Sequence, residues 1–187
     1  MPKYEIRFGG FGGQGVVLAG VILAKAASIE EGKNAVQTQL YGPDSRGGAA
    51  KSEVVISDEK IDYPKVDKTD LLVLMSQEAA EKYGSEIKDN SIIIYDADLV
   101  QLNLSGSFTP YPVRATKIAA DMGNKIAANM VMLGAVSAAT NIVSLESLLK
   151  IIEASVPAYA KELNMNAARE GFRAVKEIMG RRGGNEN

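Results

Sequence analysis

The sequence predicts an α/β protein: a three-layer α/β/α single domain with a Rossmann-like, mostly parallel sheet, a short antiparallel hairpin and a helical C-terminal part. Two observations predict this class. Short apolar segments typical of strands alternate along the chain with segments of helical character. In addition, glycine-rich segments follow the first two predicted strands, where open α/β sheets bind their ligands.

The N-terminal elements are predicted from periodicity. Residues 4–8 alternate polar and apolar side chains and form the first strand, and the helix expected over 15–31 is apolar almost all round in its first half. Residues 34–40 form the second strand. Residues 52–57 and 60–63 are expected to be short strands that form the antiparallel hairpin.

The remaining strands and helices follow from apolar runs and caps. Residues 70–75 and 91–95 are typical of buried parallel strands, whereas the prolines in 107–113 place the last strand near an edge. Ser76 should cap a short helix that stops at Gly84. Four further helices are expected over 115–122, 124–140, 144–154 and 159–179. We predict one domain over residues 1–180 and a flexible tail over 181–187.

Composition excludes several classes of partner. The 187 residues are 46% hydrophobic and 24% charged, as in ordinary globular proteins, and the net charge of -2 offers no general attraction to nucleic acid. No apolar stretch approaches the ~20 residues of a membrane span, so no membrane partner is expected. The N-terminus leads directly into a strand pattern, which predicts a cytoplasmic location.

The chain contains neither cysteine nor histidine. Without cysteine it has no thiolates for an iron-sulfur cluster, a zinc site or a nucleophile. Without histidine it lacks the side chain that titrates near neutrality and every catalytic triad that depends on it. We therefore expect no redox chemistry from this chain alone, and we predict no catalytic residue.

The first glycine-rich segment spans residues 9–15 and contains the spacing G-x-G-x-x-G from Gly10 to Gly15. Free amides at a helix N-terminus attract phosphate, and missing side chains let the phosphate approach. A dinucleotide site would also have an acidic residue after the second strand, but Gln37, Thr38 and Gln39 occupy that region. Three interpretations remain: a tight structural turn, a phosphate-containing ligand other than a dinucleotide, and contact with another subunit.

The second glycine-rich segment, Tyr-Gly-Pro-Asp-Ser-Arg-Gly-Gly, spans residues 41–48. Arg46 offers a planar set of donors to a carboxylate or phosphate. The alternative is that Arg46 pairs with Asp44 or a nearby acidic residue and only fixes the loop. The candidate cofactor-binding residues of both segments are Gly10, Gly12, Gly13, Gln14, Gly15, Ser45, Arg46, Gly47 and Gly48.

Together, these two segments and the stretch from Asn129 to Ala135 resemble the gamma subunit of the 2-oxoacid:ferredoxin oxidoreductases, most closely that of the 2-oxoglutarate enzyme. The resemblance covers essentially the whole chain. It implies an enzyme, acting on oxo groups with an iron-sulfur acceptor, that decarboxylates a 2-oxoacid and delivers the acyl group to coenzyme A. It also implies alpha, beta and ferredoxin-like partner subunits, with ferredoxin as the electron acceptor.

The resemblance implies that thiamine diphosphate, magnesium and the iron-sulfur clusters belong to the partners, that the isolated chain is inactive, and that no cofactor is bound firmly here. Coenzyme A is then the candidate ligand of the glycine-rich segments, and the chain helps to assemble the complex. The alternative function is a stand-alone Rossmann-like nucleotide-binding protein, and a third is a pure interaction protein without a ligand.

Two lesser features have competing interpretations. The apolar helices at 16–24 and 130–139 could dock partner subunits or simply pack on opposite faces of the sheet. Asp89, Asp96 and Asp98 could suggest a metal site, but without further ligand spacing we interpret them as solvated loop residues and predict no metal.

Overall fold

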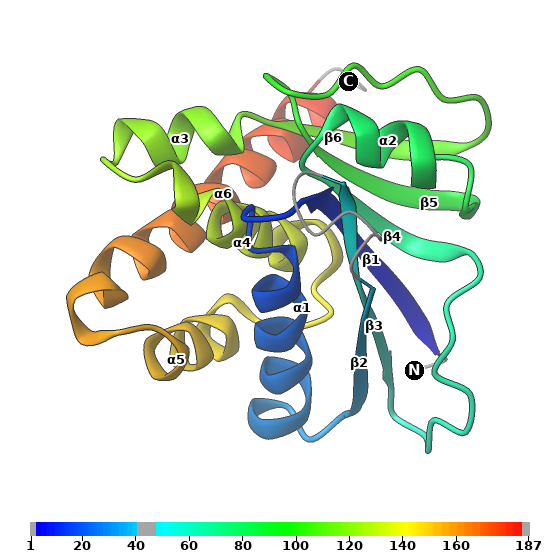
Figure 1. Cartoon of the computed structure of the whole chain (residues 1–187), viewed down its shortest axis with the longest axis horizontal. Helices are drawn as coiled ribbons and strands as arrows, with labels where there is room; N and C mark the ends of the chain where they lie inside the picture. Colours follow the sequence, from blue (N-terminus) through cyan, green and yellow to red (C-terminus); the bar gives the residue numbers. More distant parts are fainter. Residues whose placement is uncertain (1–2, 41–47, 185–187) are drawn as a thin grey trace.

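A computed structural model describes residues 3–40 and 48–184, which fold around a six-stranded sheet in the order β2-β3-β1-β4-β5-β6 (Figure 1). The strands are β1 (Tyr4–Phe11), β2 (Asn34–Leu40), β3 (Ala49–Ser57), β4 (Thr69–Leu74), β5 (Ile87–Asp96) and β6 (Phe108–Val113). β1, β4, β5 and β6 pair in parallel, whereas β3 runs antiparallel to both β1 and β2. The predicted α/β class with a mostly parallel sheet is confirmed, and β6 lies at an edge as expected.

The predicted position of the hairpin is wrong. β3 follows β2 in the chain and pairs antiparallel with it, and residues 41–48 connect the two strands. Residues 60–63 form no strand. β3 already has β1 on its other side, so it offers no free edge to a further strand. Residues 58–68 instead form an irregular connection in which Val66 is buried and its carbonyl accepts a hydrogen bond from Arg7 Nη2 at 3.1 Å.

Helices cover both faces of the sheet. They are α1 (Val16–Lys25), which continues into the π-helix η1 (Ala26–Glu30), α2 (Gln77–Tyr83), α3 (Ala115–Asp121), the 3₁₀ turn η2 (Lys125–Ala127), α4 (Ala128–Thr140), α5 (Leu145–Ser155), the 3₁₀ turn η3 (Ala158–Ala160) and α6 (Lys161–Gly183). The predicted cap of α2 is confirmed, because Ser76 Oγ accepts a hydrogen bond from Ala79 N at 3.2 Å.

Neighbouring glycines of β1 show that α1 and α2 lie on opposite faces. Successive residues of a strand point to opposite sides of the sheet. A Cβ on Gly9 would lie 3.1 Å from Ala79 and Tyr83 of α2, whereas one on Gly10 would lie 2.9 Å from Val16 of α1. The structure therefore has the three expected layers.

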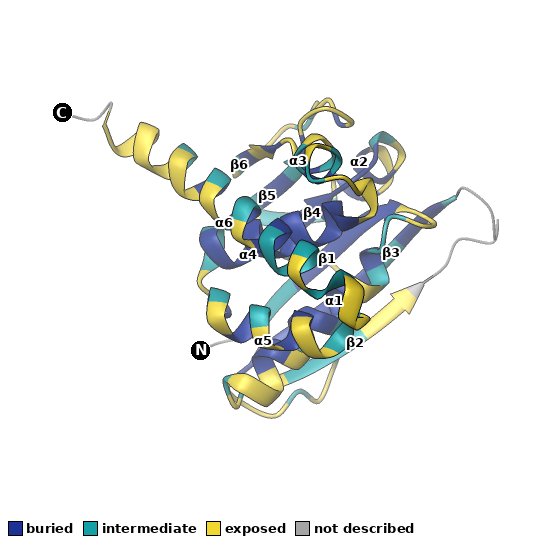
Figure 2. Ribbon diagram, turned by 90° about the vertical axis from the view of Figure 1, so that its left-hand side faces the viewer, coloured by how far each residue is buried: buried dark blue, intermediate teal, exposed yellow. Residues whose placement is uncertain are grey.

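The two helical layers are unequal. The larger hydrophobic core lies between the sheet and α1, α3, α4, α5 and α6, and a smaller one lies under α2. α4 is buried in the middle of the larger layer, while the end of α6 extends outward (Figure 2). α4 and α6 approach closely, since a Cβ on Gly134 would lie 1.8 Å from Ala168 O and one on Gly171 would lie 1.8 Å from Val131 O.

On the α2 side, the sheet carries buried and half-buried charges. Arg7 is buried and donates from Nε to Glu53 Oε1 at 2.8 Å, and it also pairs with Glu86. Farther along β1, Glu5 pairs with Lys3 at 2.7 Å and with Lys88 at 2.8 Å. These ion pairs neutralise charged side chains on the α2 side of the sheet, which α2 covers only in part.

Helix α6 ends at Gly183, so the three residues from Arg181, which the sequence assigned to a flexible tail, are helical. Arg182 packs over the ring of Tyr111 at 4.8 Å and hydrogen-bonds the carbonyl of Pro110. The division into one domain over residues 1–180 stays a prediction.

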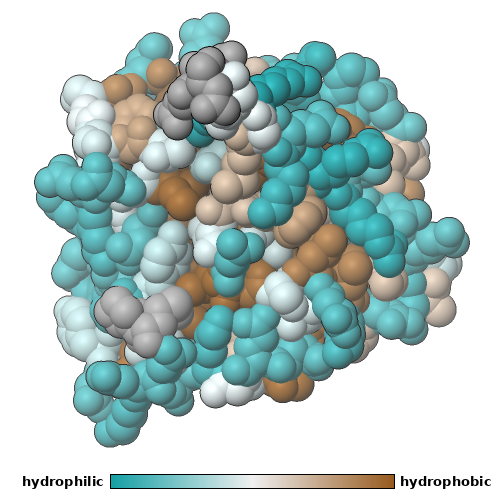
Figure 3. All heavy atoms as spheres, turned by 180° about the vertical axis from the view of Figure 1, so that it is seen from behind, coloured by the Kyte–Doolittle hydropathy of each residue, from teal (hydrophilic) through white to brown (hydrophobic). Residues whose placement is uncertain are grey.

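The surface opposite the view of Figure 1 shows several separate hydrophobic patches among hydrophilic residues (Figure 3). Among residues 3–40 and 48–184, no helix combines the length and apolar character that a membrane span requires.

Candidate functional site

The first glycine-rich segment forms a tight turn between β1 and α1. β1 extends to Phe11, so Gly9 and Gly10 lie in the strand and the turn itself spans residues 11–15. Gln14 N donates to Phe11 O at 3.2 Å, which leaves Gly12 and Gly13 as the central residues. Gly13 has φ 95° and Gly15, the N-cap of α1, has φ 73°, both in the left-handed region that favours glycine.

Gly10 and Gly15 lie so close to other side chains of the chain that an added Cβ would clash with them. A Cβ on Gly10 would lie 2.5 Å from Gln14 Oε1, and one on Gly15 would lie 2.4 Å from Asn129 Nδ2. Asn129 lies in α4 and donates from Nδ2 to the carbonyl of Gly15 at 3.2 Å. Gly10 and Gly15 therefore have close neighbours within the chain, and their assignment to a cofactor stays a prediction.

Gly12 and Gly13 differ from these glycines, because a Cβ on either residue would meet no atom within 4 Å among the described residues. Both residues are exposed. Among the described residues, no side chain caps the N-terminus of α1 and its first turn has no acidic residue, so none of these residues compensates the helix dipole there. This part of the turn is open to an approaching group.

The second glycine-rich segment begins and ends at the same edge of the sheet as the first turn. Phe11 at the end of β1 pairs with Ala49, and Leu40 at the end of β2 pairs with Lys51. The connection from β1 to α1 and the connection from β2 to β3 therefore both follow strands that end on this side of the sheet. Gly48 is described and half-buried, whereas Ser45, Arg46 and Gly47 lie outside the described residues.

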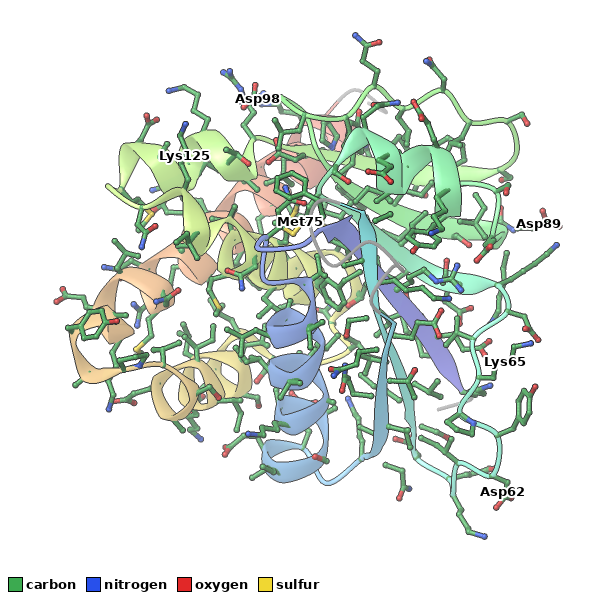
Figure 4. All side chains as sticks on the ribbon, viewed as in Figure 1. Asp62, Lys65, Met75, Asp89, Asp98 and Lys125 are labelled. Atoms are coloured by element: carbon green, nitrogen blue, oxygen red, sulfur yellow. The ribbon has the colours of Figure 1, made fainter. Side chains whose placement is uncertain are left out.

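Two cavities adjoin the first turn. One of about 310 Å³ lies at the carboxyl ends of β1, β4 and β5 and includes Gln14, Met75, Leu99, Thr116 and Lys125 in its lining. Met75, Asp98 and Lys125 come from three different segments at this end of the sheet (Figure 4). The other cavity, of about 460 Å³, runs from Gly12 along α1 to Val21.

Exposed apolar side chains border these cavities. Phe11 is 42% exposed, Leu18 on α1 is 37% exposed, and Ile126 is 68% exposed. Residues of this size at an exposed edge are typical of binding surfaces. The site therefore combines open backbone, apolar side chains and one lysine, which suits a ligand or partner with both anionic and apolar parts.

The two apolar helices differ in what they leave exposed. α4 is buried from Ala128 to Ala138 by the chain's own sheet and helices, so packing alone accounts for its composition. α1 is buried on the side that faces β3 and leaves Leu18 exposed. The docking interpretation thus remains open for α1 only.

Asp96 at the end of β5 and Asp98 just beyond it have structural partners, and the prediction that the aspartates are solvated loop residues is wrong for Asp96. Asp96 is fully buried, and its Oδ2 accepts hydrogen bonds from Thr116 N at 2.8 Å and Thr116 Oγ1 at 2.6 Å. Asp98 pairs with Arg114 at 2.8 Å and raises the pKa of that guanidinium. Asp89 lies at the far end of β5 (Figure 4). Within the described part of the chain, no three acidic side chains form a metal-binding group.

The arrangement of strands also differs from a dinucleotide site. Such a site uses a parallel strand next to β1 to place an acidic residue near the ribose. Here the antiparallel β3 occupies that position and separates β2 from β1. Gln37 of β2 donates from Nε2 to Ser52 Oγ at 2.9 Å, so its side chain is used within the sheet.

Sequence reasoning missed several residues around the turn. Asn129 holds the carbonyl of Gly15, and Met75, Thr116 and Lys125 line the cavity. For Asn129 a signal existed, because an amide within an apolar helix needs a hydrogen-bond partner. For Met75, Thr116 and Lys125 no signal existed, because local patterns do not specify which loops meet at the carboxyl ends of the strands.

The chain is similar to known proteins along nearly its whole length. The family model for pyruvate ferredoxin/flavodoxin oxidoreductase matches residues 5–174. The chain is 51% identical over 179 residues to the 2-oxoglutarate synthase subunit KorC of Methanocaldococcus jannaschii, a match that covers 94% of this chain and 96% of that subunit.

Two solved structures are also similar. The gamma subunit of a keto/oxoacid ferredoxin oxidoreductase from Geobacter sulfurreducens superposes with a TM-score of 0.87 at 44% identity, over 95% of this chain and 98% of that one. The 2-oxoglutarate:ferredoxin oxidoreductase from Magnetococcus marinus, solved with 2-oxoglutarate, coenzyme A and succinyl-CoA bound, matches with a TM-score of 0.85 at 25% identity. That match covers 94% of this chain but 31% of the longer one. The chain therefore belongs to the pyruvate ferredoxin/flavodoxin oxidoreductase family, in which it matches separate gamma-type subunits along nearly their whole length.

Proposed function

We propose that this chain is the gamma subunit of a 2-oxoglutarate:ferredoxin oxidoreductase, which converts 2-oxoglutarate and coenzyme A to succinyl-CoA and passes the electrons to ferredoxin. The single observation that supports this best is the 51% identity to a 2-oxoglutarate synthase subunit over almost the full length of both chains. The partners are the alpha, beta and ferredoxin-like subunits of the same complex.

Neither an iron-sulfur cluster nor thiamine diphosphate with its metal fits this chain. It has no cysteine to hold an iron-sulfur cluster. The sequence also lacks a convincing Gly-Asp-Gly segment with a downstream asparagine, by which thiamine enzymes hold the diphosphate and its metal. The role left to this chain is to help assemble the complex and to bind part of a substrate.

That substrate is coenzyme A, in our proposal. Gly12 and Gly13 leave backbone open beside the uncapped N-terminus of α1, which favours a phosphate. The cavity between Met75 and Lys125 offers apolar surface and a cation next to this turn. We assign Ser45, Arg46, Gly47 and Gly48 to the same ligand, with Arg46 on a phosphate or carboxylate.

Gly12→Ala in the assembled complex tests this assignment. A Cβ at Gly12 meets no atom of the described chain, and its φ lies outside the left-handed region, so the free subunit should fold normally. In the complex the added methyl group would obstruct the ligand. We expect the KM for coenzyme A to rise about tenfold, which corresponds to ~1.4 kcal/mol, with an unchanged KM for 2-oxoglutarate.

Gly180→Ala is the matched control, because Gly180 of α6 also has no atom within 4 Å of an added Cβ. It should leave both KM values unchanged. If Gly12→Ala weakens co-purification with the partner subunits but not the affinity for coenzyme A, the turn contacts a subunit instead. If it changes neither, the turn has no external contact, and the coenzyme A assignment is wrong.

A further inference from the structure

The side chain of Gln14 is hydrogen-bonded at both ends within the chain. Its Oε1 accepts from Phe11 N at 2.9 Å, and its Nε2 donates to Met75 O at 2.7 Å. The backbone amide of Gln14 also donates to Phe11 O. One residue therefore closes the turn on Phe11 and ties it to the end of β4.

The bond to Met75 extends the pairing of β1 with β4. Met75 N already donates to Gly9 O at 2.8 Å, which continues the parallel ladder past its last strand pair. The carbonyl of Met75 then receives the side chain of Gln14 in place of another backbone amide. Gly10 makes this possible, because a Cβ there would lie 2.5 Å from Gln14 Oε1.

From these contacts we infer that Gln14 is a positioning residue, which fixes the open backbone of Gly12 and Gly13 before any ligand arrives. This inference rests on the proposed function, since it assumes that coenzyme A approaches Gly12 and Gly13. It reassigns Gln14 and Gly10 from ligand contact to support of the turn. A turn held in advance loses less conformational entropy on binding, so it binds more tightly.

The test is Gln14→Met in the assembled complex, because methionine keeps the approximate length of the side chain and removes both hydrogen bonds. We expect the KM for coenzyme A to rise about fivefold to tenfold. The KM for 2-oxoglutarate and the kcat at saturating coenzyme A should stay within about twofold of wild type, because a ligand at high concentration can still order the turn.

Gln77→Met is the matched control. Gln77 is also half-buried, and its Oε1 accepts from a loop amide, Gln101 N, at 2.8 Å. Gln77 lies in α2, on the opposite face of the sheet from α1, and lines a different cavity from the one at the turn, so its loss should lower thermal stability by a similar amount and leave the KM for coenzyme A unchanged.

Gln14→Glu serves as a second variant, since its carboxylate can still accept from Phe11 N. It should assemble even if Gln14→Met does not, and it should again raise the KM for coenzyme A because the donor to Met75 is lost. An unchanged KM in either assembled variant would overturn the inference. Failure of both to assemble would also overturn it, by assigning Gln14 to folding alone.

The outcome for Gly12→Ala separates the two proposals. If Gly12→Ala raises the KM for coenzyme A and the Gln14 variants do not, the ligand assignment stands and the positioning role is wrong. If none of these variants changes that KM, the coenzyme A assignment itself is wrong.

Discussion

Glu5 shows how a single residue responds to its surroundings on the α2 side of the sheet. Burial raises the pKa of its carboxyl, but hydrogen bonds and charge from Lys3 and Lys88 outweigh burial, so the pKa lies below its ordinary value of 4.5. A carboxyl whose pKa is lower in the folded chain stabilises the fold above its unfolded pKa. This stabilisation is lost as the pH falls through the lower, folded value.

Lys88→Met should therefore change the acid stability of the chain. Lys88 contacts both Glu5 and Asp70 at 2.8 Å, and its removal should move the pKa of Glu5 upward toward the ordinary value. We expect Lys88→Met to be less stable than the wild type at neutral pH and to lose less unfolding free energy on acidification, because the folded and unfolded pKa values of Glu5 lie closer together. Urea denaturation at a series of pH values between about 3 and 7 measures this.

The control for Lys88→Met is Lys60→Met, which removes a lysine that is 86% exposed and paired with the exposed Asp62. Its effect should be small at every pH, because exposed ion pairs contribute little. Identical pH profiles for the two variants would contradict the account of Glu5.

The first turn shows which part of the candidate site is visible in a sequence. A tight turn before a helix was one of three interpretations of its glycine spacing, and the structure contains such a turn. The sequence could not separate Gly10 and Gly15, which make room for Gln14 and Asn129, from Gly12 and Gly13, which stay open. The neighbour of Gly15 lies 114 residues away, and periodicity carries no information on such a contact.

At the scale of elements, α4 and α6 pack through glycine. A Cβ on Gly171 would lie 1.8 Å from Val131 O, which is backbone and cannot rotate away. Gly171→Ala should thus push the helices apart and cost about 3 kcal/mol or more of unfolding free energy, at or beyond the upper end of ordinary overpacking. Chemical denaturation of the purified chain measures the loss.

Gly180→Ala in the same helix is the comparison. An added Cβ at Gly180 meets no atom within 4 Å in the described part of the chain, so alanine should stabilise α6 by roughly 0.5–1 kcal/mol through its helix propensity. Equal effects from the two substitutions would show that helix propensity, and not close packing, decides the outcome at Gly171.

The strands show why local patterns predict elements better than topology. Residues 34–40 form β2 as predicted, and the apolar runs lie in β4 and β5. The position of β3 between β1 and β2 depends on pairing partners distant in the chain, which a local pattern does not specify. Residues 60–63 alternate like a strand but have no free edge beside β3 to join.

At the scale of the whole molecule, the absence of cysteine and histidine makes this chain dependent on partners in our proposal. We expect the purified chain alone to contain no iron and to show no oxidation of 2-oxoglutarate. Co-expression with the partner subunits should yield a complex that contains iron and oxidises 2-oxoglutarate. Metal analysis and a ferredoxin-linked assay on the two preparations measure this difference.

Activity or bound iron in the chain alone would contradict this expectation. The same co-expression with Gly180→Ala should behave as wild type, since that substitution lies away from the turn.

The antiparallel placement of β3 has a consequence for how the family can vary. Because β2 and β3 pair along seven residue positions, their connection is a hairpin tip whose two ends are anchored by the sheet. Insertions or deletions between these ends would leave the ladder intact, because every paired residue of β2 and β3 lies outside the connection. The scaffold can therefore accept connections of different length without any change in strand register.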